Sequence, residues 1–240
     1  ALVALAACSS PDAPVEIYDP YEADNRGVHN FNRGVDSLAL RPAATGYGSF
    51  VPEPVRMGVA NFSSNLSTPS DVVNNLLQGD LGNAAHNTFR FVLNSFLGLG
   101  GLFDVATQGG CEERGTDFGQ TLAVWGAPEG AYLEVPFVGP RTERAFAGSV
   151  VDLVLNPVNY VFGPEYAVII YGARGATVLD NRFVLGDTLD EILYDSADSY
   201  VLLRSLYLQN RRFELSESGA TAGEEAFDIY EDLYGDIFEE

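Results

Sequence analysis

Few side chains in this sequence have the type and spacing that acid–base or nucleophilic catalysis requires. His29 and His86 are the two histidines, the residue type best suited to proton transfer near neutral pH, and each falls inside an amphipathic helical pattern. The sequence contains no Gly-x-Ser-x-Gly elbow, no His-Glu-x-x-His motif, no phosphate-cradling loop and no Cys-x-x-Cys pair. We therefore expect a protein that is not an enzyme and that needs no cofactor.

The carboxylates near the start of the chain have a simpler explanation than catalysis. Arg26 and Arg33 lie three or four residues from several of them, the spacing at which opposite charges pair on a helix surface. These carboxylates belong to Asp19, Glu22, Asp24 and Asp36. With only two cysteines and two histidines, the sequence also offers no cluster of metal ligands.

Cys8 has the surroundings of a cysteine that becomes acylated. Leu5-Ala6-Ala7-Cys8 follows an apolar run and fits a lipobox, in which a peptidase requires small residues before the modified cysteine. We expect residues 1–7 to be the remnant of a lipoprotein signal peptide and residues 8–17 to be a lipidated N-terminus and tether. The alternative is a fragment of buried helix with an incidental cysteine. Acylation of Cys8 on sulfur would leave Cys111 without a partner in the chain.

Charge limits the partners that this chain can bind. The formal net charge is −21, and arginine supplies all thirteen fixed cations because lysine is absent. This balance argues against nucleic acid, for which cationic contacts provide most of the affinity. It also argues against electrostatic docking on anionic lipid, which depends on clustered basic residues. No stretch of 18 apolar residues occurs, so acyl chains and apolar surface would have to provide any attachment to a membrane.

The hydrophobic periodicity predicts a mainly α-helical single domain over residues 18–215. Apolar residues recur at helical spacing from Pro20 to a stop before Arg41-Pro42, and Thr68-Pro69 has the pattern of a cap that opens a new helix ending at Gly79. Asp80 is expected to cap the next helix. Further helices are expected from Pro54 and over residues 118–125, 142–155, 165–178, 187–194 and 198–215.

The segment from Phe89 to Val105 is apolar nearly all round and is interrupted by glycines. A helix that is apolar on every face is buried in protein or in lipid. The segment is too short and too broken to span a bilayer. It is therefore either a core helix or an element that lies in one leaflet, and the membrane-facing candidates are Phe89, Phe91, Val92, Phe96, Leu97, Leu99, Leu102 and Phe103.

Glycine and charge mark two further segments. Residues 126–139 are extended and punctuated by glycine, which indicates a glycine-rich hairpin or loop with Gly126 and Gly130 in its turn. Residues 216–240 form an acidic tail with aromatic and aliphatic residues three or four positions apart. This tail is either a disordered solubilising segment or an amphipathic helix that folds on a partner.

Five ordered blocks give the chain a resemblance to a known family. They are YDPYEADNRGVHNFNRGVDSLALRP from Tyr18, YGSFVPEPVRMGVANFSSNLSTPSDVVNNLLQGD from Tyr47, FRFVLNSFLGLGGLFDVAT from Phe89, FGQTLAVWGAPEGAYLEVPFVGP from Phe118 and DSYVLLRSLYLQNR from Asp198. In this order the blocks resemble the MlaA (VacJ) lipoproteins of Gram-negative outer membranes. The resemblance covers roughly residues 18–213.

The resemblance implies a fold and a function. The fold is a ring seated in the inner leaflet of the outer membrane, held by a lipid anchor on the periplasmic side, with Gly126 and Gly130 in a hairpin loop beside a channel. The implied function is retrograde transport, in which mislocalised phospholipid leaves the outer leaflet and passes to a soluble, MlaC-like periplasmic carrier. Trimeric porins are the implied membrane partners. The alternative is a structural envelope lipoprotein that scaffolds complexes without moving lipid.

The lipobox generates a direct test. Because no apolar run is long enough to span a bilayer, Cys8→Ala should leave the chain unlipidated and largely absent from the outer membrane. Metabolic labelling with an acyl precursor, followed by membrane fractionation, measures both properties. Normal labelling and normal fractionation of the variant would rule out the lipobox.

Overall fold

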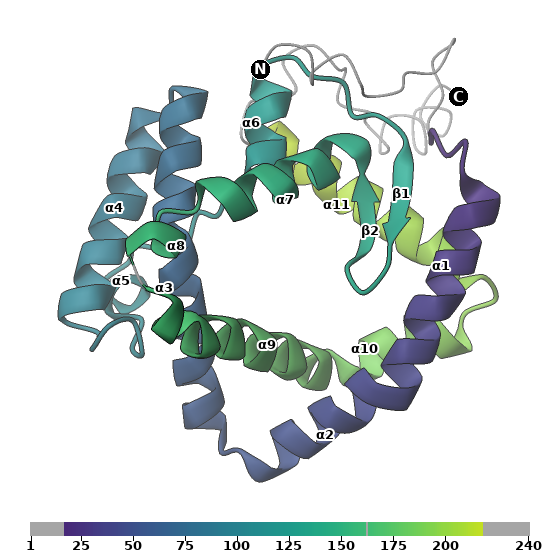
Figure 1. Ribbon diagram of the computed structural model, residues 1–240, viewed down its shortest axis with the longest axis horizontal. Helices are drawn as coiled ribbons and strands as arrows, with labels where there is room; N and C mark the ends of the chain where they lie inside the picture. Colours follow the sequence, from purple (N-terminus) through teal and green to yellow (C-terminus); the bar gives the residue numbers. More distant parts are fainter. Residues whose placement is uncertain (1–16, 162, 218–240) are drawn as a thin grey trace, which may run out of the picture.

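Helices arranged in a ring make up almost all of the structure (Figure 1). The computed structural model describes residues 17–161 and 163–217, so Cys8 and residues 218–240 of the acidic tail lie outside the described residues. The α-helices are α1 Glu22–Val35, α2 Arg41–Phe50, α3 Glu53–Gln78, α4 Leu81–Phe96, α5 Val105–Gln108, α6 Phe118–Val124, α7 Glu143–Leu155, α8 Val158–Val161, α9 Ala167–Val184, α10 Gly186–Asp190 and α11 Ser199–Glu217.

Short irregular elements join these helices. Two are π-helical turns, η2 Asp36–Leu40 and η4 Glu191–Asp195, and one is a 3₁₀ turn, η3 Pro164–Tyr166. The strands β1 Tyr132–Val135 and β2 Gly139–Thr142 pair antiparallel as a single hairpin. The prediction of a mainly α-helical, ring-like domain is therefore confirmed.

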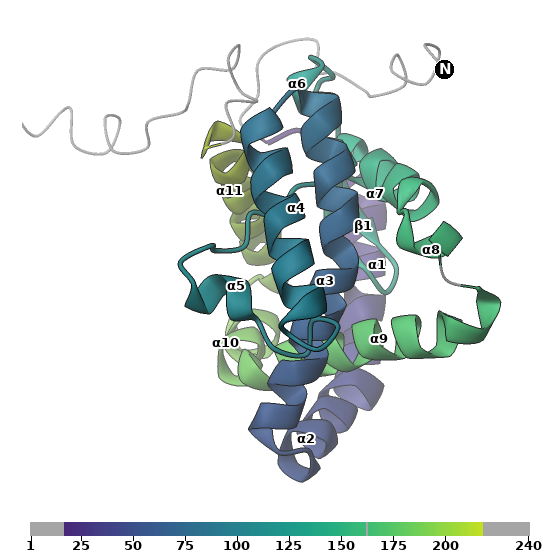
Figure 2. The same cartoon turned by 90° about the vertical axis from the view of Figure 1, so that its left-hand side faces the viewer.

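The ring is assembled from neighbours that are distant in sequence. In Figure 1, α1 and α2 form one side, α3 and α4 form the opposite side, and α9 crosses between them. α9 packs against both α2 and α3, and α6 packs against α7. The hairpin completes the circuit because β1 packs on α1 and β2 contacts α11. Figure 2 shows α3 and α4 standing side by side in the wall of the ring.

Local sequence explains most helix ends. Gly79 ends α3 in the left-handed conformation, with φ of +78°. Asp80, Asp117 and Thr142 cap α4, α6 and α7, because each side chain accepts a hydrogen bond from the backbone three residues later. The cap predicted at Asp80 is confirmed, and α7 begins where the sequence predicts a helix over residues 142–155.

Two predicted helix boundaries are wrong. α3 continues through Thr68 and Pro69, and the Thr68 hydroxyl donates to the carbonyl of Ser64 instead of capping a new helix. The first helix does not stop before Arg41-Pro42 either. The π-turn η2 carries it into α2, where Pro42 occupies the first turn and needs no hydrogen-bond partner for a backbone N–H.

The hairpin also lies later in the chain than predicted. Its strands pair Tyr132 with Thr142 and Val135 with Gly139, which places the turn at residues 136–138. Gly126 and Gly130 precede β1, in the connection from α6. The turn is predicted there because glycine can adopt left-handed backbone angles. Both glycines do adopt them, with φ of +82° at Gly126 and +77° at Gly130, but they do so outside the hairpin.

Glycine permits a close approach at the crossing of α6 and α7. A Cβ added to Gly148 would lie 2.2 Å from the backbone nitrogen of Gly119. The two helices can therefore approach this closely only because both positions lack a side chain. In contrast, Gly172 and Gly175 within α9 have open space beside them and support no close crossing.

Two asparagines of α1 serve as hydrogen-bonding partners for the free edge of β1. Asn25 donates to the carbonyl of Tyr132 at 3.0 Å and accepts from the N–H of Glu134 at 2.9 Å. Two helical turns further on, Asn32 donates to the carbonyl of Val135 at 3.0 Å and accepts from the N–H of Phe137 at 2.8 Å. Because an unpaired strand edge needs partners for its backbone groups, these amides dock the hairpin on α1.

The docking gives a stability prediction. Asn25→Ala should leave two buried backbone groups of β1 without partners and lower the free energy of unfolding by about 2–4 kcal/mol. Urea unfolding of the detergent-solubilised chain, followed by circular dichroism, measures the loss. Asn30→Ala is the matched control, because Asn30 is exposed on the same helix and should change stability by less than about 0.5 kcal/mol. Equal losses in the two variants would contradict this docking role.

Candidate functional site

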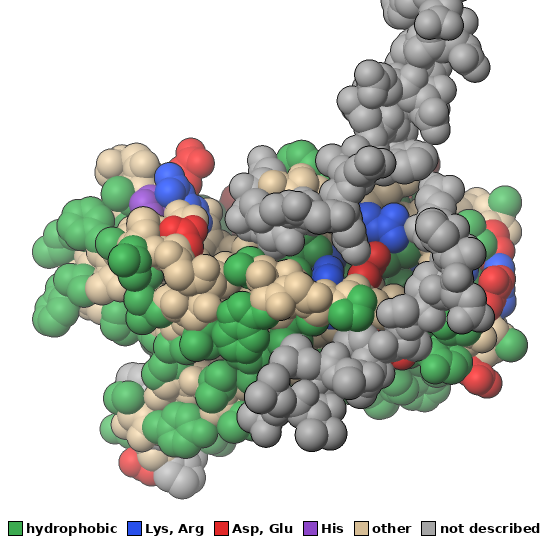
Figure 3. Space-filling model, turned by 90° about the horizontal axis from the view of Figure 1, so that it is seen from above, with side chains coloured by type: hydrophobic (Ala, Val, Ile, Leu, Met, Phe, Trp, Pro, Cys, Tyr) green, Lys and Arg blue, Asp and Glu red, His purple; other side chains and the backbone are tan. Residues whose placement is uncertain are grey.

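The outer surface of the ring carries large apolar side chains, whereas much of what is buried is polar. The buried polar and charged side chains include Asn25, His29, Asn74, Arg90 and Arg182. The apolar core consists of small clusters, one of which joins Leu66, Val158 and Ile170. Figure 3 shows hydrophobic side chains exposed on the outer side of the ring at the left, where α3 and α4 lie in Figure 1. This distribution is the reverse of a water-soluble protein.

Helix α4 shows the inversion clearly. Its polar residues Asn87, Arg90 and Asn94 are buried, at spacings of three and four, and therefore face the interior together. Its apolar residues point outward, and Phe96 is 80% exposed. The structure thus excludes the hypothesis that α4 is a core helix buried on all sides. Its apolar face is free to contact lipid.

The exposed apolar residues of α4 and of the loop after it form a continuous set, which we call the apolar belt. Seven of the eight membrane-facing candidates are exposed, and Phe91 is half-buried. The seven are Phe89, Val92, Phe96, Leu97, Leu99, Leu102 and Phe103.

A buried network fixes the loop that carries the end of the belt. The Arg90 guanidinium donates to Asp104 at 3.2 Å, to the hydroxyl of Thr107 at 2.8 Å and to the carbonyl of Cys111. Asn94 donates to the other oxygen of Asp104 at 2.9 Å. Burial alone would raise the pKa of Asp104, but hydrogen bonds from Thr107, Asn94 and Arg90 lower that pKa to about 2. The polar side of the loop is therefore held inward while its leucines and phenylalanines face outward.

The connection that holds Gly126 and Gly130 is tied to neighbouring helices. Arg144 of α7 is buried and donates to the carbonyl of Ala127 at 2.8 Å. Arg212 of α11 pairs with Glu129 at 3.0 Å. These contacts hold the segment that leads into the hairpin. The turn of the hairpin is exposed, and its Phe137 side chain is 76% accessible to solvent. The role of the two glycines in lipid passage stays a prediction.

A polar groove of about 750 Å³ lies between the end of α3, the start of α4 and the segment before α6. Asp71 lines it and accepts a hydrogen bond from the backbone of Thr116 at 3.3 Å. Burial raises the pKa of Asp71 to about 7, partly offset by the Thr116 hydrogen bond and reinforced by the negative charges of Glu113, Asp152 and Asp117. Acidic side chains therefore outnumber basic ones in the groove, and the carboxyl group of Asp71 gains its proton at a higher pH than an exposed aspartate does.

The inward polar face of α4 could have been predicted from its polar residues, although the spacing of its apolar residues does not reveal it. Asn87, Arg90 and Asn94 interrupt a largely apolar helix at helical spacing, which marks a polar stripe as clearly as leucines would mark an apolar one. Among the helices of residues 17–161 and 163–217, none has both the length and the hydropathy of a membrane-spanning segment.

The family model described as MlaA lipoprotein matches residues 17–214. The chain belongs to the MlaA lipoprotein family. Among relatives, the intermembrane phospholipid transport system lipoprotein MlaA of Escherichia coli K12 is 35% identical over 199 residues, covering 81% of this chain and 77% of that protein. The protein of the same name from Haemophilus influenzae is 30% identical over 237 residues, covering 93% of this chain and 91% of its own length.

A solved structure agrees with the family assignment. It is described as "Structural basis for maintenance of bacterial outer membrane lipid asymmetry", is 34% identical and superposes with a TM-score of 0.71. The superposition covers 82% of this chain and 98% of that chain. The relatives are named as lipoproteins of a phospholipid transport system, and the solved structure is described in terms of lipid asymmetry of the bacterial outer membrane.

The apolar belt makes a prediction that separates membrane contact from folding. In a chain that also carries Cys8→Ala, Phe96→Ser should weaken binding to phospholipid vesicles by up to about tenfold, because it removes the apolar surface of a large aromatic side chain. The temperature of thermal unfolding should not change, since Phe96 packs into no core. Vesicle flotation and circular dichroism measure the two effects.

The control for this prediction is Phe213→Ser, which alters an exposed phenylalanine on α11, outside the belt. Vesicle binding of this control should match that of the chain with Cys8→Ala alone. Equal weakening in both variants, or no weakening from Phe96→Ser, would show that the belt does not contact lipid.

Proposed function

We propose that this chain is an outer-membrane lipoprotein that removes mislocalised phospholipid from the outer leaflet and passes it to a periplasmic carrier. The observation that carries the proposal is the inverted polarity of the ring, with apolar side chains outside and hydrogen-bonded polar side chains inside. A molecule built in this way is suited to a surrounding of lipid and to a polar passage.

The physical problem of lipid transport matches this construction. A phospholipid must move a charged head group without placing it in hydrocarbon, where an unpaired polar group costs several kcal/mol. Its acyl chains must meanwhile remain in an apolar phase. A ring that lies in one leaflet, with polar side chains inside and apolar side chains outside, offers a polar path for the head group next to an apolar phase for the acyl chains.

Attachment to the outer membrane follows from two features in this proposal. The described helices provide no spanning segment, so acyl chains on Cys8 would anchor the chain on the periplasmic side and the apolar belt would sink into the leaflet. The net charge of −21 excludes attraction to anionic head groups as the main force.

The partners come from the family resemblance. Trimeric porins would contact the ring within the membrane, and an MlaC-like carrier would accept lipid on the periplasmic side. The hairpin beside the ring opening is the candidate moving element. Since Arg144 and Glu129 fix its start, the motion would lie in the turn that exposes Phe137, with Gly126 and Gly130 shaping the approach to β1.

The alternative is a scaffold that binds envelope proteins without moving lipid. The two functions differ in whether the purified chain carries phospholipid. We expect phospholipid to copurify with the detergent-solubilised chain, measured by mass spectrometry of the extracted protein.

We also expect the chain to lower surface-exposed phosphatidylethanolamine in a strain that lacks its own family member, measured with a membrane-impermeant amine reagent. The chain with Cys8→Ala serves as the control and should restore much less. A chain that carries no lipid and leaves surface phospholipid unchanged, although it is abundant in the outer membrane, would establish the scaffold instead.

A further inference from the structure

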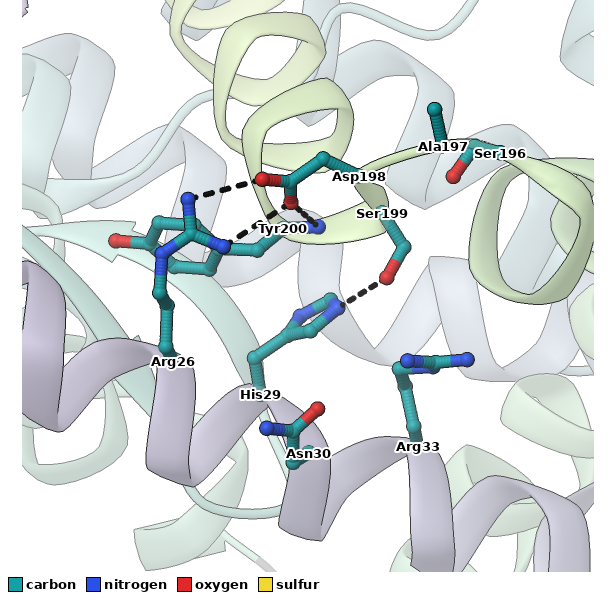
Figure 4. A pocket seen from close by; sticks show the side chains of 9 residues that line it. All are labelled: Arg26, His29, Asn30, Arg33, Ser196, Ala197, Asp198, Ser199 and Tyr200. Carbon is teal, nitrogen blue, oxygen red and sulfur yellow. Dashed lines mark hydrogen bonds and ion pairs between the residues drawn. The ribbon is translucent and has the colours of Figure 1, made fainter.

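A polar pocket of about 280 Å³ lies between α1 and the start of α11. Figure 4 shows Arg26, His29 and Arg33 pointing from α1 toward the segment Ser196–Tyr200. Their spacing of three and four residues places them on one face of the helix. In a chain with 34 acidic residues and 13 arginines, two arginines lining one small pocket stand out.

The one carboxylate that lines the pocket, Asp198, is already neutralised. Arg26 donates to both of its oxygens, at 3.2 and 2.9 Å, and also pairs with Glu22 at 2.8 Å. Asp198 further accepts hydrogen bonds from the backbone of Tyr200 and Val201, each at 3.1 Å, and so caps α11. Arg26 and Asp198 therefore form a closed set of charges that needs no further ion.

His29 is likewise engaged. Its Nε2 lies 2.9 Å from the hydroxyl of Ser199, and its Nδ1 lies 3.5 Å from the buried carboxylate of Glu134. Glu134 stands behind the imidazole, hydrogen-bonded to Tyr132 at 2.5 Å, and does not line the pocket. His29, and not Glu134, lines the pocket, and its ring is hydrogen-bonded to Ser199.

Arg33 is the exception. Within residues 17–161 and 163–217 its guanidinium makes no ion pair, and its Nε is buried without a hydrogen-bond partner. Its only marked neighbour is the ring of Tyr194, whose centre lies 5.6 Å from the guanidinium carbon. Other arginines of the described residues have carboxylate partners, such as Arg182 with Asp36 and Arg90 with Asp104. A buried charged donor without a hydrogen-bond partner is costly, and a bound anion that accepts from the same guanidinium is one explanation for it.

We propose that this pocket binds a phosphate group, with Arg33 as its principal ligand. A guanidinium matches phosphate because its N–H groups form a rigid fork that contacts two oxygens at once. Asn30 and Ser199 line the same pocket and offer an amide and a hydroxyl to the remaining oxygens. The volume of about 280 Å³ suits a phosphate with a small substituent and excludes acyl chains.

A phosphate monoester or diester could come from solution or from a phospholipid head group. The pocket itself depends only on the residues described above. That its natural ligand is a lipid head group rests on the proposed function, in which the chain handles phospholipid. The two sources differ in whether acyl chains on the ligand add affinity.

The experiment uses isothermal titration calorimetry on the detergent-solubilised full chain with three probes: inorganic phosphate, glycerol 3-phosphate and dihexanoyl phosphatidylglycerol below its micelle concentration. We expect Arg33→Gln to weaken the binding of glycerol 3-phosphate by about tenfold or more. Arg174→Gln is the matched control, because Arg174 also lies over a tyrosine ring, that of Tyr171, but lines no part of this pocket. It should leave binding unchanged.

The outcomes separate the possibilities. Tighter binding of the lipid probe than of glycerol 3-phosphate, lost in Arg33→Gln, supports a head-group site, whereas equal binding of all three probes supports a site for free phosphate. No binding of any probe, or the same loss in both variants, overturns the pocket. Because these readouts are made on purified protein, a failed pocket leaves the surface-phospholipid test of the proposed function intact. Circular dichroism of Arg33→Gln confirms that any loss of binding is not a loss of folding.

Discussion

Buried hydrogen bonds and ion pairs close the ring, and the rest of the structure depends on them. Asn25 joins α1 to β1. Arg182 of α9 donates to both oxygens of Asp36 at 2.7 and 2.9 Å and to Asp190 at 2.6 Å. This arginine therefore joins η2, which contains Asp36, to α9 and to α10, which ends at Asp190. Asn74 joins α3 to α7 through Asp152 at 2.8 Å. Each such bond contributes only about 1 kcal/mol net, but losing one partner costs more, so the seams tolerate little change.

Because hydrogen bonds and ion pairs hold the elements of the ring together, its apolar side chains are free to lie on the outer surface. A water-soluble ring of this size would have to bury its leucines and phenylalanines to hold together. Here α4 turns them outward and directs Arg90 and Asn94 to the interior, where Asp104 meets both. In a leaflet, lipid tails cover the outward face at no cost, and the hydrogen bonds inside are protected from competing water. One sequence thus combines an apolar outer face with a hydrogen-bonded polar interior.

Local signals in the sequence predicted the helix cap at Asp80 and the mainly helical class, because these depend on neighbours within a few residues, whereas they left open whether the segment from Phe89 is a core helix or lies in a leaflet. Long-range contacts decided what failed. Pro69 lies inside α3 because packing against α4 and α9 maintains the helix across it. The hairpin begins at Tyr132 because amides more than a hundred residues away pair with its edge. Arg33 stands out only when Arg26, Arg41 and Arg182 are each seen to pair with an aspartate.

The polar interior also determines how stability varies with temperature. The heat capacity of unfolding rises by about 0.45 cal/mol/K for each Å² of apolar surface newly exposed to water, and falls by about 0.26 for each Å² of polar surface. The largest fully buried side chains are Tyr132 and Leu215 together with the polar Asn74, Asn87, Thr121 and Thr142, whereas the protein itself does not bury the apolar belt. The chain therefore unfolds with a smaller heat-capacity change than a water-soluble protein of equal length, and its stability curve is correspondingly flat.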